Sequence, residues 1–373
     1  MAGALTYLDN NATTPVRPEV IGMMTGVLNA CGNPSSIHGP GRAARSRLEC
    51  ARAQIAALAG ARASEVVFTS GGTEANNLAL RGAPVARVLA SAIEHDSVLK
   101  SAPSGAPIPV LPCGVTDLSA LEAMLEESRD PALVSIMLAN NETGILQPVA
   151  EAARLAHAHG ALLHCDAVQA AGKIPLHMPA LGADLLSLSA HKFGGPQGAG
   201  ALIVRDGVRL ASQMRGGGQE RGLRGGTENA AAITGFGHAA QMALETLDEL
   251  PDRLYGLRAR LEAGVAEITP QAVFFGQDRP RLPNTSCFSL PGVRASTLVM
   301  NLDLMGVAVS AGAACSSGKV TPSPVLRAMG VGEALADSAI RVSLGWANSP
   351  EDVEAFLAAW RAICARLTLP MAS

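Results

Sequence analysis

The sequence predicts an α/β fold: a mainly parallel sheet flanked by helices, followed by a smaller α+β unit. Strand-like and helix-like segments alternate from about residue 50 to 205, which is typical of parallel strands joined by crossover helices. Hydrophobic residues make up 48% of the 373 residues and charged residues only 16%, so a large core can be buried. Beyond Pro251 the alternation loosens, and the pattern there indicates a second, smaller unit.

The expected strands are apolar runs bounded by turn-forming residues, and they cover residues 65–70, 87–93, 132–138, 161–165, 184–189 and 200–204. Helices are expected over residues 73–80, 151–159 and 228–249, and Pro251 interrupts the last. The smaller unit is expected to hold a helix near 253–267, strands near 284–290 and 339–344, and an amphipathic helix at 350–366. We therefore predict a large domain of residues 14–248 and a small domain of residues 1–13 and 249–373.

Charge and composition exclude several kinds of function. The net charge of −3 gives no basic field for nucleic acid. No apolar run is long enough to span a bilayer, and residues 1–9 lack the regions of a signal peptide, so we expect no membrane contact and a cytoplasmic location. The seven cysteines are scattered without a CxxC pair, which indicates neither a disulfide framework nor a metal site.

Lys192 is the most informative residue of the chain. It is one of only four lysines, and it follows His191 at the end of an apolar run, just before two glycines. The run is typical of a buried strand, and open α/β sheets bind their ligands at the carboxyl ends of strands. A lysine there can lose its proton through desolvation and become an amine nucleophile, which is the chemistry of a Schiff base.

Asp166 directly follows an earlier strand, 192 − 166 = 26 residues before Lys192. One helix-length connection separates the two, so both side chains are expected on the same edge of the sheet. Pyridoxal phosphate needs such a pair: a lysine for the Schiff base and an acid at the ring nitrogen. The alternative is an aspartate that caps the next helix and a lysine that is merely exposed.

The segment Ser70-Gly-Gly-Thr-Glu74 lies between a predicted strand and a predicted helix. Glycines such as Gly72 let the backbone approach an anion, the N–H groups of a helix start point at it, and Thr73 adds a hydroxyl. The alternative is a plain turn in which Thr73 caps the helix. The segment lacks the ending of a Walker loop, which disfavours a nucleoside triphosphate. The glycine-rich residues 194–200 are interrupted by proline, so a hairpin-like turn is expected there.

Three more residues carry possible chemistry, and each has a plainer alternative. His95 follows a strand and could stack on a cofactor ring and shuttle protons, although a lone strand-end histidine is often structural. Cys315 lies among glycines and small residues, where its thiol could be a nucleophile or simply a tolerated side chain. Arg341 lies in an apolar strand, where its guanidinium suits a substrate carboxylate or an internal ion pair.

Together these segments resemble the NifS-type cysteine desulfurases, in the class V branch of the fold type I pyridoxal phosphate enzymes. The matching motifs run in order along the chain: YLDNNATTP at 7–15, GNPSS at 32–36, FTSGGTE at 68–74, EH at 94–95, NNETG at 140–144, HCDAVQ at 164–169, SAHK at 189–192, GGGQERG at 216–222, GT at 226–227, SAGAACSS at 310–317 and IRVSLG at 340–345. Each motif is modest alone, but their order and spacing together are specific. The resemblance implies seven strands in the large sheet.

The resemblance also implies how pyridoxal phosphate is held. Lys192 forms the Schiff base and moves protons, Asp166 pairs with the ring nitrogen, and Gln169 bonds the phenolic oxygen. His95 stacks on the ring and acts as an acid and base. The phosphate contacts are implied for the backbone around Gly72 and for the side chains of Thr73, Ser189 and His191.

The implied reaction converts L-cysteine to L-alanine. Asn141 lies by the cofactor and the substrate, and Arg341 binds the substrate carboxylate. Cys315 attacks the substrate sulfur and carries it as a persulfide to an acceptor, such as an iron–sulfur scaffold protein. Thr227 would reach the phosphate of the other subunit, which implies a homodimer. The alternatives are a selenocysteine lyase, another class V enzyme such as an aminotransferase, which needs no thiol, and a non-catalytic scaffold, which would have lost these residues.

Overall fold

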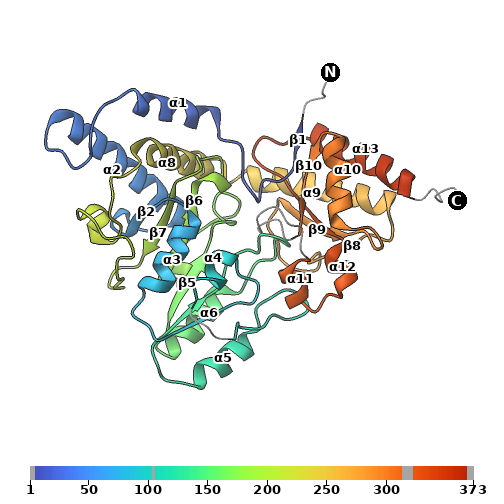
Figure 1. Cartoon of the computed structure of the whole chain (residues 1–373), viewed down its shortest axis with the longest axis horizontal. Coiled ribbons are helices and arrows are strands. Elements are labelled where there is room, and N and C mark those ends of the chain that lie inside the picture. The colour runs from blue at the N-terminus through green and yellow to red at the C-terminus, as the bar shows by residue number, and fades with distance from the viewer. Residues whose placement is uncertain (1–4, 103–105, 313–321, 368–373) are drawn as a thin grey trace.

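The computed structural model describes residues 5–102, 106–312 and 322–367 (Figure 1). Its large sheet has the strand order β2-β7-β6-β5-β4-β3. The strands are β2 (Val66–Thr69), β3 (Arg87–Ala90), β4 (Ala132–Ser135), β5 (Leu162–Asp166), β6 (Leu185–Ser189) and β7 (Gly200–Val204). All neighbours from β3 to β6 pair in parallel, whereas β7 runs antiparallel to both β6 and β2. The expected turn at residues 194–200 joins β6 to β7.

Six strands are found in the described residues where the resemblance implies seven. At the place of a seventh strand, beside β3, Ile108 forms a single parallel bridge with Ser91. Its N–H donates to the carbonyl of Ala90, and its own carbonyl accepts from Ala92. Prolines at positions 107 and 109 flank it. Because proline has no N–H to donate, the ladder cannot extend in either direction.

Both faces of the large sheet are covered, which explains why its strands are continuous apolar runs. Ala201 and Ile203 of β7 belong to a core that also includes residues of α2 (Gly39–Ala59), α6 (Val149–Ala158) and α8 (Ala230–Glu245). Leu202, between them, points to the opposite face, where α3 (Gly72–Gly82) and α4 (Asp96–Leu99) pack. Because the strands from β3 to β6 are parallel, the segments that follow them meet at one edge of the sheet.

The long helix expected over residues 228–249 is shorter in the structure. Helix α8 ends at Glu245, and α9 (Leu250–Ile268) begins five residues later with Pro251 in its first turn. A proline in a first turn leaves no hydrogen bond unmade, because that N–H has no partner within the helix. Pro251 therefore starts one helix instead of interrupting another.

The smaller antiparallel sheet has the order β11-β12-β9-β8. Its strands are β8 (Val273–Phe274), β9 (Thr285–Ser289), β11 (Ser310–Ala311) and β12 (Ala339–Ser343). The N-terminal strand β1 (Thr6–Tyr7) pairs in parallel with β10 (Val307–Ala308), and in Figure 1 it lies among these C-terminal elements. Leu8 shares a core with Phe288 and Trp360, over α9, α10 (Ala295–Leu304) and α13 (Pro350–Leu367). This packing agrees with a small domain made from both chain ends, although the domain boundaries stay a prediction.

The remaining elements are shorter or lie outside the two sheets. They are α1 (Pro18–Leu28), α5 (Leu118–Glu126), α7 (Met178–Leu181), α11 (Pro324–Ala328), α12 (Glu333–Asp337), and the 3₁₀ turns η1 (Ala63–Glu65), η2 (Ala190–Lys192) and η3 (Gln219–Gly222). Among the described helices none combines the length and the apolar composition needed to cross a membrane.

Candidate active site

A cavity of about 320 Å³ lies where β5 and β6 end and α3 begins. Nine of the ten predicted cofactor residues line it: Gly72, Thr73, His95, Asn141, Asp166, Gln169, Ser189, His191 and Lys192. The tenth, Thr227, is exposed and does not line the cavity. Cys315 lies outside the described residues. Residues that are far apart in sequence thus meet at one edge of the large sheet.

Lys192 ends the 3₁₀ turn η2 and reaches across the cavity wall to the N-terminal segment. Its Nζ donates to the carbonyl of Asn11 at 2.6 Å and to that of Ala12 at 2.9 Å. The side chain is half-buried, so the alternative of a merely exposed lysine does not describe it. Gln169 joins the same group, because its Nε2 donates to the Asn11 carbonyl at 2.9 Å.

Asp166 is the last residue of β5 and is 7% exposed. Its Oδ1 accepts from the N–H of Val168 at 3.0 Å, within a turn and not at the start of a helix, so the helix cap of the alternative is not what the structure has here. Its Oδ2 accepts from Asn76 Nδ2 at 2.7 Å. The carboxylate is therefore fixed at the cavity by one bond to its own turn and one to α3.

Asn76 and Ser97 are polar cavity residues that the sequence interpretation missed. Asn76 lies four residues after Gly72 and four before Leu80, so helical spacing alone places it on the buried face of α3. A polar residue at such a position needs a hydrogen-bond partner. That signal was present in the sequence, whereas nothing comparable distinguishes Ser97.

The end of the cavity near Ser189 fits an anion. Ser189 Oγ is buried and has no hydrogen-bond partner within the described residues. Gly71 is the N-cap of α3, and no side chain in the described part of the chain caps that helix. The N–H groups of its first turn are thus available to a phosphate, and Ser189 would complete its own hydrogen bonding there. Thr73 is the second residue of α3 and not its cap, contrary to the plainer alternative.

Close packing at this end of the cavity leaves no room for a side chain at two glycines. A Cβ at Gly200 would lie 2.5 Å from Gly71 Cα, and one at Gly72 would lie 2.9 Å from Val168 Cγ2. Burial, aided by the nearby Lys192 and Lys173, lowers the pKa of His191 to about 4. His191 is therefore neutral at physiological pH and can hold an anion only by hydrogen bonding. Taken together, these residues fit the phosphate and the ring of pyridoxal phosphate.

A second carboxyl group lies near Asp166. Glu94 is buried, and burial together with the charge of Asp166 raises its pKa well above the usual range. Its Oε1 accepts from the N–H of Met137, and its Oε2 has no hydrogen-bond partner in the described residues. Burial thus disfavours a negative charge on Glu94, which reduces the repulsion that Asp166 would meet from it.

Arg341, on β12, is only 2% exposed. Its Nη2 pairs with Asp9 Oδ1 at 2.7 Å and its Nη1 donates to the carbonyl of Asn141 at 3.0 Å, so the internal ion pair foreseen as an alternative is present. Nε has no partner within the described residues. Arg341 does not line the cavity itself, but it contacts the backbone of a residue that does.

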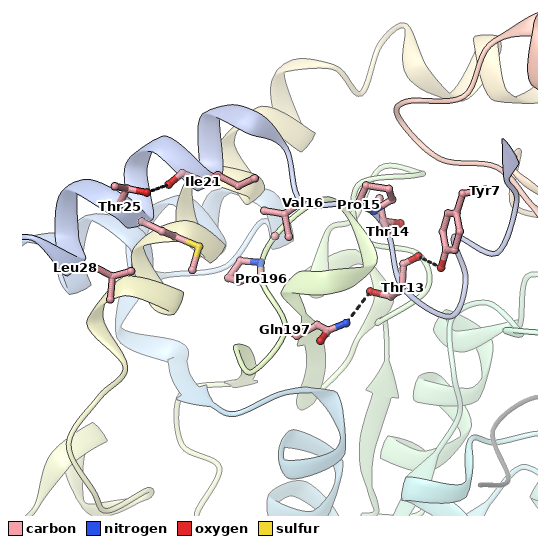
Figure 2. A pocket seen from close by; sticks show the side chains of 12 residues that line it. Tyr7, Thr13, Thr14, Pro15, Val16, Ile21, Thr25, Leu28, Pro196 and Gln197 are labelled. Carbon is pink, nitrogen blue, oxygen red and sulfur yellow. Dashed lines mark hydrogen bonds between the residues drawn. The ribbon is translucent and has the colours of Figure 1, made fainter. Parts of the chain in front are cut away.

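Three larger hollows occur in the described structure, and none holds this chemistry. One, of about 530 Å³, lies beside α1 and is lined by Val16, Ile21, Leu28 and Pro196 among others (Figure 2). Another, of about 620 Å³, lies beside α9 and is lined by Tyr255, Arg258 and Arg281 among others. The third, of about 390 Å³, lies between the end of α9 and α13. Volume alone would therefore point away from the Lys192 cavity, and its side-chain chemistry is the better guide.

The fold and the cavity define an enzyme of the fold type I pyridoxal phosphate class. The chain belongs to the class V aminotransferase family, whose profile matches residues 6–356, and the cofactor of that family is pyridoxal phosphate. A cysteine desulfurase of Cereibacter sphaeroides is 46% identical over 361 residues, which cover 92% of each chain. An IscS-like cysteine desulfurase of Mycobacterium tuberculosis is 43% identical, over 95% of this chain and 94% of the relative. The crystal structure of a NifS-like protein from Rickettsia africae matches with a TM-score of 0.90 and 38% identity, over 96% of this chain and 99% of that one.

Proposed function

We propose that this protein is a cysteine desulfurase. It would transfer the sulfur of L-cysteine to the Cys315 thiol, so that the carbon–sulfur bond breaks, a sulfur–sulfur bond forms, and L-alanine and a Cys315 persulfide result. The observation that carries the proposal is the cavity that brings Lys192, Asp166 and His95 together. The desulfurases among the relatives support the choice of reaction.

Each cavity residue has a proposed task toward the cofactor. When bound, pyridoxal phosphate accepts the electron pair released at the substrate Cα. Lys192 would hold the cofactor and move the Cα proton, and Asp166 would keep the ring nitrogen protonated. Gln169 would hold the phenolic oxygen. Thr73, Ser189 and His191, with the first turn of α3, would hold the phosphate.

The remaining tasks concern the substrate and the sulfur. Arg341 would bind the substrate carboxylate from beside Asn141. It could use its Nε, which has no partner within the described residues, and its Nη2 once the pair with Asp9 rearranges. His95 would give and take protons above the cofactor ring. The persulfide on Cys315 would pass to a sulfur acceptor or an iron–sulfur scaffold protein in the cytoplasm.

The test is production of alanine and sulfide from L-cysteine with a thiol reductant present. Lys192→Ala should abolish both products and the yellow colour of the loaded protein. Cys315→Ala should keep the colour but stop both products. Cys50→Ala, at a cysteine that is exposed in the described part of the chain, is the matched control and should behave as wild type. Normal turnover by Cys315→Ala would refute the proposed sulfur carrier, and turnover of selenocysteine alone would favour the lyase.

We also propose that the protein is a homodimer. Thr227 is exposed and does not line the cavity of its own chain, which is consistent with its serving a second copy. Large apolar side chains are exposed on α1 and just after it: Ile21 at 53%, Leu28 at 72% and Ile37 at 90%. Ile21 and Leu28 also line the hollow beside α1 that Figure 2 shows. Covering such side chains contributes up to about 1.5–3 kcal/mol each, so this surface suits a second copy of the chain.

Light scattering after size-exclusion chromatography tests the dimer. Leu28→Glu combined with Ile37→Glu should yield a monomer that loses cofactor more readily than wild type. Leu304→Glu, at a residue that is 79% exposed on α10, is the matched control and should leave the mass unchanged. A monomeric wild type with normal cofactor retention would exclude the proposal.

A further inference from the structure

Two side chains outside the predicted set join His95 to Asp166. Asn76 lies on α3 and is 1% exposed, and Ser97 lies on α4 and is 8% exposed. Both line the cavity. They link His95, which is expected over the cofactor ring, to Asp166, which is expected at the ring nitrogen. The proposed function gives these two residues separate tasks, whereas the bridge couples them.

The bridge is a continuous series of hydrogen bonds. Asn76 Nδ2 lies 2.7 Å from Asp166 Oδ2 and 2.8 Å from Ser97 Oγ. Ser97 Oγ in turn lies 2.8 Å from His95 Nδ1. The backbone N–H of Ser97 also donates to His95 Nδ1, at 3.1 Å, so His95 is the N-cap of α4.

The direction of every bond in this series follows from its ends. As a carboxylate, Asp166 can only accept, so the amide of Asn76 must turn its NH₂ group toward it. The second N–H of Asn76 then goes to Ser97 Oγ, which leaves the single hydroxyl hydrogen for His95 Nδ1. A backbone N–H can only donate, so Ser97 N imposes the same role on Nδ1. Two independent donors therefore meet one ring nitrogen, which must present its lone pair.

We infer that Asn76 and Ser97 are positioning residues that hold His95 as the tautomer with its ring proton on Nε2. This inference rests on the proposed function for its catalytic meaning, but the tautomer itself follows from the chain alone. His95 then offers a proton donor at Nε2 from the start, because Nδ1 is occupied as an acceptor. Through Asn76 and Ser97, Asp166 thereby supports the protonation pattern of a histidine that it does not touch.

Nuclear magnetic resonance of protein labelled with ¹⁵N-histidine tests the tautomer directly. Long-range ¹H–¹⁵N spectra distinguish protonated from unprotonated ring nitrogens, and His95→Gln identifies the His95 signals among those of the eight histidines. In the wild type loaded with pyridoxal phosphate, Nε2 should be protonated and Nδ1 should not. A protonated Nδ1 in the neutral ring would overturn the inference.

Variants then test the bridge. The backbone N–H of residue 97 still donates to Nδ1 in both Ser97→Ala and Asn76→Leu. These variants should therefore move the Nδ1 signal only part of the way toward the average of the two tautomers, and lower kcat by up to about 100-fold with a smaller effect on KM. Ser97→Thr keeps a hydroxyl and should restore both readings. Ser101→Ala, at a buried serine that does not line the cavity, is the matched control. Wild-type signals in both Ser97→Ala and Asn76→Leu would refute the bridge.

The two levels of the proposal can fail separately. If the protein does not convert cysteine, but His95 in cofactor-free protein has the Nε2 proton and responds to Ser97→Ala, the desulfurase proposal fails and the positioning role stands. If cysteine is converted but the tautomer differs, the reverse holds. Should Asn76→Leu not fold, the wild-type tautomer and the Ser97 variants still decide the matter.

Discussion

Lys173 Nζ donates to Gln169 Oε1 at 3.1 Å, from a position directly behind the cavity wall. The same amine donates to the Gln169 carbonyl at 3.0 Å and lies 3.4 Å from Asn11 Oδ1. Lys192 contacts the backbone of Asn11 from the other side. Two lysines therefore share one small polar cluster, and burial together with the charges of Lys192 and Arg341 lowers the pKa of Lys173 well below its usual range.

Lys173→Met should change how stability depends on pH. In the unfolded chain a lysine binds a proton below about pH 10.4, whereas folded Lys173 binds it only below its lowered pKa. Between those values the unfolded state holds more protons, so wild-type stability falls as pH falls. The variant lacks this slope, which amounts to at most about 1.4 kcal/mol per pH unit. Denaturant unfolding of cofactor-free protein from pH 8 to 10.5 measures the difference.

Lys100→Met is the matched control, because Lys100 is exposed. It should show the wild-type slope. A Lys173→Met variant with that same slope would contradict the lowered pKa. Since Met cannot orient Gln169, we also expect weaker retention of the cofactor by this variant.

The pair Arg52–Glu220 ties α2 to the glycine-rich loop that leads to Thr227. Its two bonds are each 2.8 Å long, and the side chains are 7% and 1% exposed. Glu220 also accepts from the N–H of Phe68 at 2.8 Å. The pair holds Glu220 and Arg221 in left-handed backbone conformations, with φ of 45° and 56°, that non-glycine residues rarely adopt.

Arg52→Met should lower the free energy of unfolding by about 3–5 kcal/mol, because it leaves Glu220 as a buried charge without its partner. Adding Glu220→Met should recover part of the loss by removing that charge. Arg260→Met breaks an ion pair with Glu354 whose side chains are 52% and 55% exposed, and should cost under about 1 kcal/mol. Equal losses at positions 52 and 260 would show that the Arg52 pair is not a buried anchor.

The sequence predicts the large sheet and most of the site for one physical reason. Short apolar runs mark buried strands, and the residues that follow parallel strands meet at one sheet edge. Asp166, Lys192 and His95 were found in this way, and all three line one cavity. The roles at Gln169, Asn141 and Thr227 came from the resemblance instead, because nothing in their local pattern indicates a ligand.

Other features depend on packing that a single sequence does not display. Helix α2 was not among the expected helices, and the burial of nine of its residues follows from its packing against the rest of the fold. Ser97 is one polar residue in a four-residue helix, and its importance follows from the neighbours that the fold brings to it. Residues 107–109, in contrast, carry a signal that the sequence does display. Their two prolines indicate that a seventh strand could not extend there.

Gly237 and Gly256 should respond in opposite ways to alanine. A Cβ at Gly237, on α8, would lie 2.4 Å from Ala51 Cα on α2, where the two helix backbones meet. Gly237→Ala should therefore lower stability by about 1–3 kcal/mol through overpacking. Gly256, exposed on α9, has nothing within 4 Å of its virtual Cβ. Gly256→Ala should raise stability by about 0.4–1 kcal/mol, and thermal unfolding of both variants checks the contrast.

Glu142 should make the protein less stable as the pH rises toward neutrality. It is 4% exposed, and its Oε2 accepts from Ser323 Oγ, which also caps α11. Burial raises its pKa to about 7, although Ser323 and Arg341 oppose the shift. The folded pKa lies above the unfolded value of about 4.3. The contribution of this carboxyl group to stability is therefore fully present below about pH 4.3 and is lost as the pH rises through about 7.

Glu142→Gln keeps a hydrogen-bonding group but cannot ionise, so it should not lose this stability. Its free energy of unfolding relative to wild type should rise by about 3 kcal/mol between pH 4.5 and pH 8. Guanidinium titrations followed by the fluorescence of Trp346 and Trp360 give the values at each pH. Glu122→Gln, at an exposed glutamate on α5, controls for the loss of one carboxyl group. A constant difference between Glu142→Gln and wild type over this range would mean that Glu142 ionises in the folded protein as it does in the unfolded chain.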